Sequence, residues 1–240
     1  MPPASRRATV ARRQRANTQG FMSNDTLTHL AAHHGDFEDF ARLMQQTASG
    51  RFNQVWWGVW RQYVAPVLPA TGTVVDLGCG PGGLFAPLRH EHPQVEIIGV
   101  EVQPAMVREA QTVAQSVGAQ VVVADLSRPL PLADGIADVV TLAHVVHELP
   151  WPVPLLREAF RMLRPGGACL VYDWVRQPLQ SYADSAEITE DLLQHFREHC
   201  LLTPDDLAFL CTNVGFSVQE VIGRRGGRYA MVILSKPERI

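Results

Sequence analysis

The residues whose types and spacing point most directly to chemistry lie in a glycine-rich loop, Gly78 to Gly83. The loop satisfies the pattern G-x-G-x-x-G, which in dinucleotide-binding proteins turns free backbone N–H groups toward a pyrophosphate at the N-terminus of a helix. Two neighbours argue against a phosphate: Asp76 places a carboxylate just before the loop, and Pro81 removes one N–H donor from it. The loop therefore favours a ligand that carries positive charge and can approach glycines closely.

Two further carboxylates extend this candidate site. Glu101 follows Gly78 by roughly 20 positions, where an acidic residue can accept hydrogen bonds from both hydroxyls of a ribose, as it also does in NAD sites. Asp125 could accept from an adenine amino group, and Met106 and Leu126 could sandwich the ring. S-adenosyl-L-methionine carries an ammonium, a sulfonium, a ribose and an adenine but no phosphate, so it satisfies all of these features.

The elements that must position these residues are short apolar runs that alternate with helical stretches, a pattern typical of a parallel sheet with right-handed helical crossovers. Two helices, at 36–46 and 52–64, precede the sheet, and two strands joined by a hairpin-like turn at 223–227 complete it. We predict an α/β fold, a Rossmann-like, doubly wound, mostly parallel seven-stranded sheet with a C-terminal antiparallel hairpin and N-terminal helices. The expected strands are 73–77, 95–100, 121–123, 137–142, 169–172, 216–222 and 229–234, and the other expected helices are 83–90, 104–117, 154–163, 188–199 and one that begins at 204.

Five motifs follow one another in order between about residues 71 and 174: Val74 to Gly82, Gly99 to Glu101, Ala124-Asp125, Leu130 to Leu132 with Ala137 to Val140, and Leu163 to Gly167. In these motifs the sequence resembles the class I (Rossmann-like) S-adenosylmethionine-dependent methyltransferases, particularly the small-molecule branch that includes ubiquinone and menaquinone biosynthesis enzymes. Leu163 to Gly167 has no expected chemical role beyond ending a helix.

The resemblance implies how the cofactor would be divided among the motifs. The acid before the loop and two of the glycines would hold the methionine part, the acid after the second strand the ribose, and the acid and leucine after the third strand the adenine. A histidine beyond the fourth strand would line the far side. With their neighbours, these residues form the expected cofactor-binding set: Asp76, Gly78, Cys79, Gly80, Gly82, Glu101, Val102, Met106, Asp125, Leu126 and His144.

The catalytic candidates lie at the ends of the fourth and fifth strands, where open α/β sheets place their ligands. They are His147, His144 and Asp173, with Glu148 and Tyr172 beside them. The resemblance implies no fixed catalytic signature, because the sulfonium is already activated and a base is needed only if the acceptor must lose a proton. His147 is as consistent with a structural role as with proton transfer, and Asp173 could equally be a helix cap.

Two other patterns have both a functional and a structural interpretation. Trp56, Trp57, Trp60 and Tyr63 could shape an aromatic acceptor pocket, although such a stripe at helical spacing is more often core. His195 and His199, four residues apart on an expected helix, could reach one metal ion. No third ligand or His-Glu-x-x-His pattern accompanies them, and the family requires no metal, so none is expected.

The composition of the 240-residue chain, 46% hydrophobic and 19% charged, is that of a globular protein. Residues 1–21 hold five arginines and no acid, so the remainder is more acidic than the formal net charge of −3 indicates, which disfavours a nucleic-acid partner. The cysteines form no Cys-x-x-Cys pair and no apolar run would span a membrane, which predicts a cytoplasmic protein with no membrane partner.

We expect a disordered basic tail at 1–21, a helical cap at 22–70 and a methyltransferase core at 71–240. No pattern indicates an oligomeric state.

The leading hypothesis is therefore methyl transfer from S-adenosyl-L-methionine to a small-molecule acceptor by in-line displacement. A non-catalytic cofactor-binding module or a methyltransferase-like partner protein is the main alternative. A nicotinamide-dependent oxidoreductase is disfavoured because Lys236 is the only lysine and no tyrosine precedes it by four residues. Protein or RNA methylation lacks an Asn/Asp-Pro-Pro-Tyr motif. Thiol or metalloid methylation would require paired exposed cysteines, whereas Cys79 and Cys169 are predicted to be buried.

Overall fold

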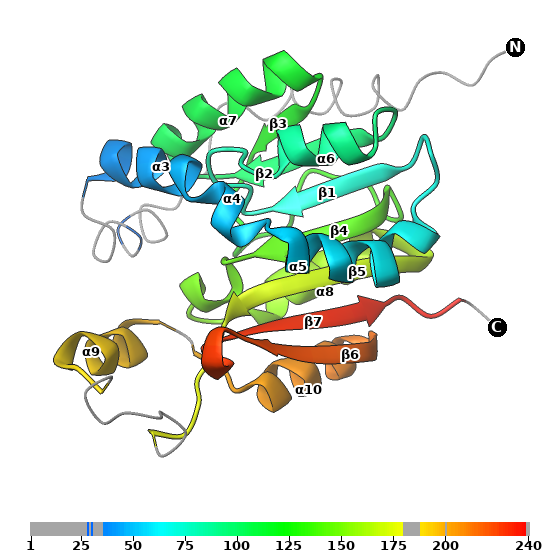
Figure 1. Cartoon of the computed structure of the whole chain (residues 1–240). Coiled ribbons are helices and arrows are strands. Elements are labelled where there is room, and N and C mark those ends of the chain that lie inside the picture. Colours follow the sequence, from blue (N-terminus) through cyan, green and yellow to red (C-terminus); the bar gives the residue numbers. More distant parts are fainter. Residues whose placement is uncertain (1–27, 29, 31–35, 180–187, 200, 239–240) are drawn as a thin grey trace, which may run out of the picture.

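A seven-stranded sheet forms the centre of the computed structural model, which describes residues 28, 30, 36–179, 188–199 and 201–238. The expected basic tail at 1–21 and the start of the expected cap lie outside the described residues. The strand order is β3-β2-β1-β4-β5-β7-β6, and β7 alone runs antiparallel to its two neighbours (Figure 1). This order confirms the predicted fold class. The strands are β1 (Thr73–Leu77), β2 (Glu96–Glu101), β3 (Gln120–Val123), β4 (Ala137–Ala143), β5 (Leu163–Trp174), β6 (Ser217–Arg224) and β7 (Tyr229–Ser235).

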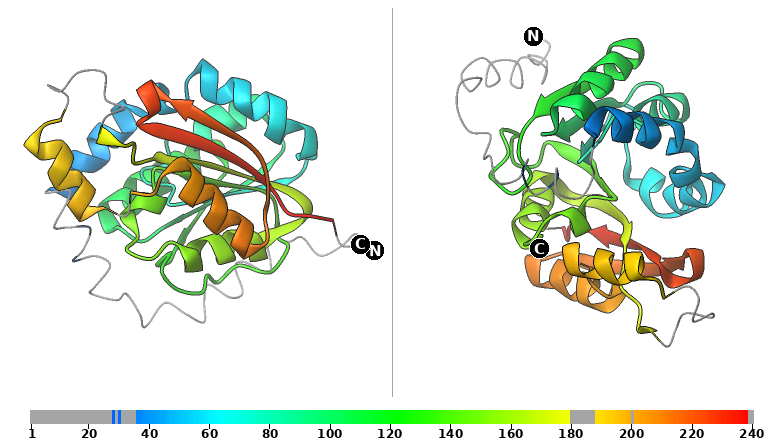
Figure 2. Two further views of the ribbon diagram at one scale, coloured as in Figure 1. Left: turned by 90° about the horizontal axis from the view of Figure 1, so that it is seen from below. Right: turned by 90° about the vertical axis from the view of Figure 1, so that its left-hand side faces the viewer.

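Helices cover both faces of the sheet, because the strands are apolar on both sides (Figure 2). One face packs against α5 (Gln54–Val59), α6 (Phe85–Glu91) and α7 (Pro104–Val117), and the other against α8 (Val153–Met162) and α10 (Pro204–Val214). In the described part of the chain, no helix is long and apolar enough to cross a membrane. The remaining helices are α3 (Phe37–Gln46), α4 (Ala48–Arg51) and α9 (Glu190–Glu198), with short turns η1 (Trp60–Val64), η2 (Ala65–Val67), η3 (Val146–Glu148) and η6 (Arg225–Gly227).

The aromatic stripe of the N-terminal helices lies in the core. The Trp56 and Trp60 rings stack with their centroids 5.2 Å apart, and both side chains are buried against the sheet. The Trp60 indole N–H donates to Nε2 of His92 at 2.8 Å. The helix is α-helical only to Val59 and continues as one π-helical turn, η1. The stripe therefore anchors the N-terminal helices to the sheet and does not shape a pocket.

The strand order reverses direction at β1, which lies between β2 and β4. In open α/β sheets such a reversal leaves a crevice beyond the carboxyl ends of the strands. The loops after β1, β2 and β4 therefore meet at one edge, where α3 and α4 also lie (Figure 1). Side chains that are far apart in the sequence are brought together at this edge.

The fifth strand is longer than the sequence pattern predicts. It begins at Leu163 rather than Cys169, so the segment expected only to end a helix is part of the strand. The reason is pairing with the end of β7: Gly166 N–H donates to the Lys236 carbonyl at 2.8 Å, and Lys236 N–H donates to the Gly167 carbonyl at 2.9 Å. A register irregularity between Ala137 and Val139 accommodates the added residues.

Candidate active site

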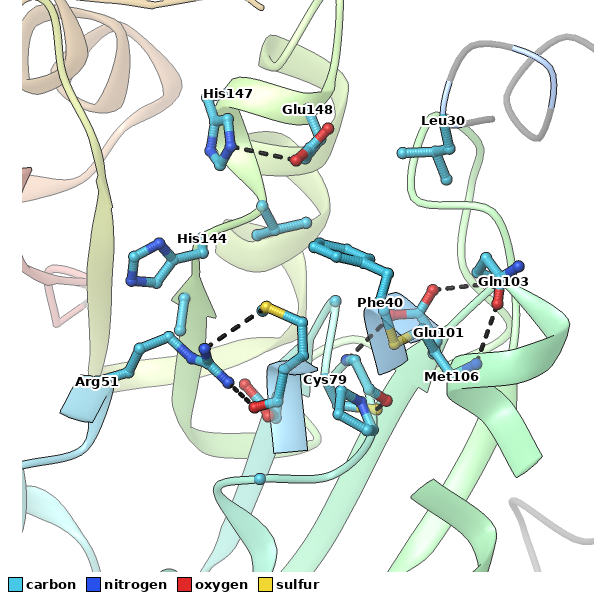
Figure 3. Close-up of a pocket in the computed structure, with 18 of the residues that line it drawn as sticks. Leu30, Phe40, Arg51, Cys79, Glu101, Gln103, Met106, His144, His147 and Glu148 are labelled. Atoms are coloured by element: carbon cyan, nitrogen blue, oxygen red, sulfur yellow. Dashed lines mark hydrogen bonds and ion pairs between the residues drawn. The ribbon is translucent and has the colours of Figure 1, made fainter. Parts of the chain in front are cut away.

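A cavity of about 700 Å³ lies at the carboxyl edge of the sheet (Figure 3). Its floor is the glycine-rich loop after β1, and its walls are the ends of β2 and β4, the first turn of α7 and the loop after β3. Helices α3 and α4 contribute residues from above, and the ends of β5 and β7 close the side nearest α9. The cavity therefore collects residues from nearly every element that reaches this edge.

Glu101 ties the glycine-rich loop to the end of β2. One carboxylate oxygen accepts from the Gly80 N–H at 3.0 Å, and the other accepts from the N–H groups of Val102 at 2.8 Å and Gln103 at 2.9 Å. Burial raises the pKa of the Glu101 carboxyl, although these three backbone hydrogen bonds lower it. The carboxylate is thus held in one orientation at the cavity wall, where it can accept from a ligand hydroxyl.

Asp76 lies at the bottom of the cavity and is almost fully buried. Its carboxylate accepts from the Thr141 hydroxyl of β4 at 2.6 Å. Burial raises its pKa from 3.8 to about 6, against the lowering effect of that hydrogen bond, and the Glu101 carboxylate adds to the increase. A buried carboxylate beside a second one is a site where a cationic group would be stabilised.

The adenine end of the expected site is apolar on two sides. Met106 and Leu126 are both buried and both line the cavity. Gln103 caps α7 by accepting from the Met106 N–H at 3.0 Å, which fixes the first turn of the helix. Asp125 begins the loop after β3 and accepts from the backbone N–H and the hydroxyl of Ser127 at 2.9 and 2.7 Å. A flat ring with a polar edge would fit between these walls.

The loop after β4 presents two histidines to the cavity. His144 has φ of 58°, a left-handed conformation that costs a non-glycine residue free energy and is characteristic of functional sites. Its backbone N–H donates to the Tyr172 carbonyl at 2.8 Å, and its ring contacts the rings of Tyr172 and Tyr229, at centroid distances of 4.7 and 5.2 Å. The neighbouring strand thus holds His144 in this strained backbone position.

His147 is held between two carboxylates. Its Nδ1 lies 2.5 Å from a carboxylate oxygen of Asp173, and its Nε2 lies 3.2 Å from one of Glu148. The other Asp173 oxygen accepts from the Val146 N–H at 2.6 Å. Burial lowers the pKa of His147, but Asp173 and Glu148 outweigh it and raise the pKa to about 10. Both ring nitrogens of His147 therefore face a carboxylate.

The structure brings almost all the expected site residues together. Every member of the expected cofactor-binding set lines the cavity except Gly82. Gly82 turns away because its position faces the core, where a Cβ atom would lie 2.9 Å from Phe85. Among the catalytic candidates, His144 and His147 line the cavity, whereas Asp173 does not. The buried Asp173 side chain contacts the site through the ring of His147 and through the backbone N–H groups of Val145 and Trp174, which line the cavity.

Several lining residues are absent from the expected cofactor-binding and catalytic sets. Arg51 and Phe40 come from the N-terminal helices, Trp174 and Tyr229 from paired positions at the ends of β5 and β7, and His199 from beyond α9. Helical periodicity identifies these N-terminal helices but does not say which residues face the strand ends. Two sequence signals were present: Trp174 follows an acid at a strand end, and His199 follows His195 by four residues on an expected helix.

The fold and the place of the cavity resemble those of the class I, Rossmann-like methyltransferases. Residues 75–171, less than half of the chain, match the family model described as a methyltransferase domain, so the chain carries a methyltransferase domain, and its cofactor is S-adenosyl-L-methionine. The match begins within β1 and ends within β5, which spans the loops that form the cofactor side of the cavity.

Two curated relatives each match less than half of this chain. A ubiquinone/menaquinone biosynthesis C-methyltransferase of Desulfotalea psychrophila is 29% identical over 116 residues, which are 48% of this chain and 47% of that protein. A trans-aconitate 2-methyltransferase of Azoarcus is 38% identical over 104 residues, 43% of this chain and 40% of that protein. The matches therefore span less than half the length of these relatives.

Solved structures resemble this chain over most of its length. A putative methyltransferase of Haloferax volcanii, in complex with the Trm112 methyltransferase activator, superposes with a TM-score of 0.67 at 18% identity, covering 85% of this chain and 98% of that one. An S-adenosylmethionine-dependent methyltransferase of Aquifex aeolicus superposes with a TM-score of 0.61 at 19% identity, covering 83% and 97%. At these identities the likeness is one of fold.

Proposed function

We propose that the protein transfers the methyl group of S-adenosyl-L-methionine to a small-molecule acceptor. The observation that carries this proposal is a single cavity with two chemically different ends. One end holds the carboxylates of Asp76 and Glu101 beside the glycine-rich loop, and the other is lined by His144, His147 and aromatic side chains. A cationic donor and an uncharged or anionic acceptor can thus meet within one space.

At the donor end we assign each part of the cofactor to a group of the cavity. Asp76 and the loop glycines would face the methionine part, because a buried carboxylate favours an ammonium. Glu101 would accept from the ribose hydroxyls, since its orientation is already fixed by three backbone N–H groups. Asp125 would meet the adenine amino group, and Met106 and Leu126 would hold the ring between them.

At the acceptor end the protein's main contribution is alignment. The acceptor atom attacks the methyl carbon from the side opposite the sulfur, the carbon–sulfur bond breaks, and the electron pair of that bond stays on sulfur to leave S-adenosylhomocysteine. Any proton on the acceptor atom is then released to solvent water. His144 and His147 would contact the acceptor, whereas Asp173 acts as a positioning residue through His147. Residues 22–70 would form a cap over a core at 71–240, since α3 and α4 roof the cavity.

Calorimetric titration with S-adenosylmethionine, S-adenosylhomocysteine and NADH tests the proposed function. We expect the first two to bind at one site per chain and NADH not to bind. Transfer of a labelled methyl group to phenolic, carboxylic, amine and thiol acceptors then separates an enzyme from a non-catalytic cofactor-binding module. Binding of NADH alone would contradict the assignment of the donor site, and cofactor binding without transfer to any acceptor would favour the module.

Cofactor affinity should depend on the ionisation of Asp76. Its pKa is about 6 in the free protein, and a bound ammonium favours the ionised carboxylate. Below pH 6 the free protein must therefore release a proton to bind, so affinity for S-adenosylhomocysteine should fall about tenfold between pH 7 and pH 5. Glu101 and the Cys79 thiol face Asp76, and burial raises the pKa of each, that of Cys79 far above this range.

The variant Asp76→Asn distinguishes the titration of Asp76 from that of Glu101, because it keeps the size of the Asp76 side chain and removes its charge. We expect weaker binding at pH 7 and little change between pH 7 and pH 5 in calorimetric titrations. A full tenfold change that persists in Asp76→Asn would assign the pH dependence to Glu101 instead.

A further inference from the structure

Three side chains at the acceptor end of the cavity converge as metal ligands would. His147, Glu148 and His199 each offer one ligand atom, and these atoms all lie within 4.8 Å of one another. Nε2 of His147 lies 3.2 Å from one carboxylate oxygen of Glu148, and Nδ1 of His199 lies 3.5 Å from the other. The centroids of the two imidazole rings are 5.2 Å apart, and the ring planes are tilted by 52°.

We propose that His147, Glu148 and His199 bind a divalent transition-metal ion in the wall of the cavity. Ligand atoms that bind one zinc-like ion at about 2.0–2.2 Å lie roughly 3–4 Å apart, so the observed spacing needs only a small closure around an ion. All three side chains are largely buried, with exposures of 7%, 15% and 5% in that order, so the site is shielded from bulk water. Together they supply two imidazole nitrogens and one carboxylate.

Asp173 supports this assignment from behind His147. It holds Nδ1 of the ring at 2.5 Å, so Nε2 is directed toward Glu148 and the centre of the cluster. A carboxylate that orients a ligand histidine in this way is a regular feature of metal sites, because it fixes the ring and increases its basicity. The Val146 N–H in turn holds Asp173, at 2.6 Å. The orientation of His147 therefore exists before any ion is bound.

The ligand set indicates which ion would bind and what it would do. Two histidines and one carboxylate favour zinc, iron(II), manganese or cobalt over magnesium and calcium, which prefer ligand sets composed of oxygen. Three protein ligands leave at least one coordination position open, and all three residues line the cavity. Resting on the proposed methyl transfer, this geometry points to an acceptor with a metal-binding oxygen, such as a hydroxyl or carboxylate.

The cluster is assembled from segments that are remote in the sequence. His147 and Glu148 lie in η3 after β4, whereas His199 follows α9. Of the two histidines considered from the sequence, His195 and His199, only His199 belongs to this cluster. Its two partners in the cluster come from the loop after β4. The side chain of His195 lies outside the described residues.

Titration of the chelator-treated full-length protein with Co²⁺, followed by visible absorption, tests the site. We expect saturation at one equivalent with the band intensity of a four- or five-coordinate ion, and Zn²⁺ should displace the Co²⁺. His199→Ala and Glu148→Gln should each weaken Co²⁺ binding at least about 100-fold, more than the 10–100-fold that follows loss of an outer-shell partner. Asp173→Asn should fall within that smaller range.

A matched control is His90→Ala, which removes an exposed histidine outside the cavity and should leave Co²⁺ binding unchanged. A cooperative thermal unfolding transition, measured by circular dichroism, shows that each variant is folded. Failure of Co²⁺ to saturate at one equivalent, or equal affinity in His199→Ala, would overturn the metal site. If the parent protein binds Co²⁺ but not S-adenosylhomocysteine, the proposed function fails and the metal site stands.

Discussion

Replacing Glu101 with alanine is expected to weaken binding of S-adenosylhomocysteine at least about 100-fold. The substitution removes the acceptor assigned to both ribose hydroxyls, and hydrogen bonds to a charged group contribute about 1.5–3 kcal/mol each. It also leaves the N–H groups of Gly80, Val102 and Gln103 without the carboxylate that now holds them. The glycine-rich loop would then lose its fixed position as well as its ligand.

Calorimetry with S-adenosylhomocysteine measures this loss directly, and thermal unfolding should show no ligand-induced increase in Tm. Glu109→Ala is the matched control, because Glu109 lies on the exposed side of α7, away from the cavity. It removes the same charge at a nearby position and should bind normally. A Glu101→Ala protein that is folded and binds within threefold of the parent would show that the ribose site is wrongly assigned.

The second large effect is expected for Gly78→Ala, which should lower the free energy of unfolding by about 2–5 kcal/mol. Gly78 has φ of +72°, and an added Cβ would lie 2.4 Å from Cγ2 of Val145 and 2.9 Å from its Cβ. Overpacking of this kind costs about 1–3 kcal/mol, and the left-handed backbone adds about 1–2 kcal/mol for a residue with a Cβ. Val145 is buried and its N–H donates to Asp173 at 3.2 Å, so it has little room to move.

Gly80→Ala provides the comparison, because Gly80 also has a positive φ, +53°, but a Cβ there would meet nothing within 4 Å. Only the backbone cost of about 1–2 kcal/mol should appear. Urea denaturation of the two variants beside the parent measures both values. Equal destabilisation by the two substitutions would contradict the predicted contact with Val145. Separately, we expect the folded fraction of Gly78→Ala to have lost its affinity for the cofactor.

The fold, and the convergence of three acids on one cavity at the edge of the sheet, were predictable because both depend on local pattern. Asp76, Glu101 and Asp125 each follow or end a parallel strand, and parallel strands bring their carboxyl ends to one edge regardless of how other elements pack. The thiols of Cys79 and Cys169 are buried, as predicted, because both lie among apolar residues of the sheet. Within the described ranges, strand and helix boundaries differ from expectation mainly at β5.

The end of the cavity that we propose for the acceptor was less predictable from the sequence. It depends on how separate helices and strands pack against one another, and no local sequence pattern specifies that packing. Arg51 reaches the cavity only because α4 crosses the strand ends, and His199 only because the segment after α9 folds back toward η3. Gly82 shares the glycine-rich loop with Gly78, yet an added Cβ there would meet Phe85 and Ala110 in the core. Asp173 stands at a strand end, but its side chain points inward.

The position of β7 between β5 and β6 has a consequence for how the protein is made. During synthesis β5 and β6 both leave the ribosome before the strand that separates them, and Ala230 to Leu234 of β7 are almost fully buried once it is in place. Until that strand arrives, the outer edge of β5 has no partner, and an unpaired edge invites association with another chain. The nascent protein is therefore most exposed to aggregation just before its sheet is completed.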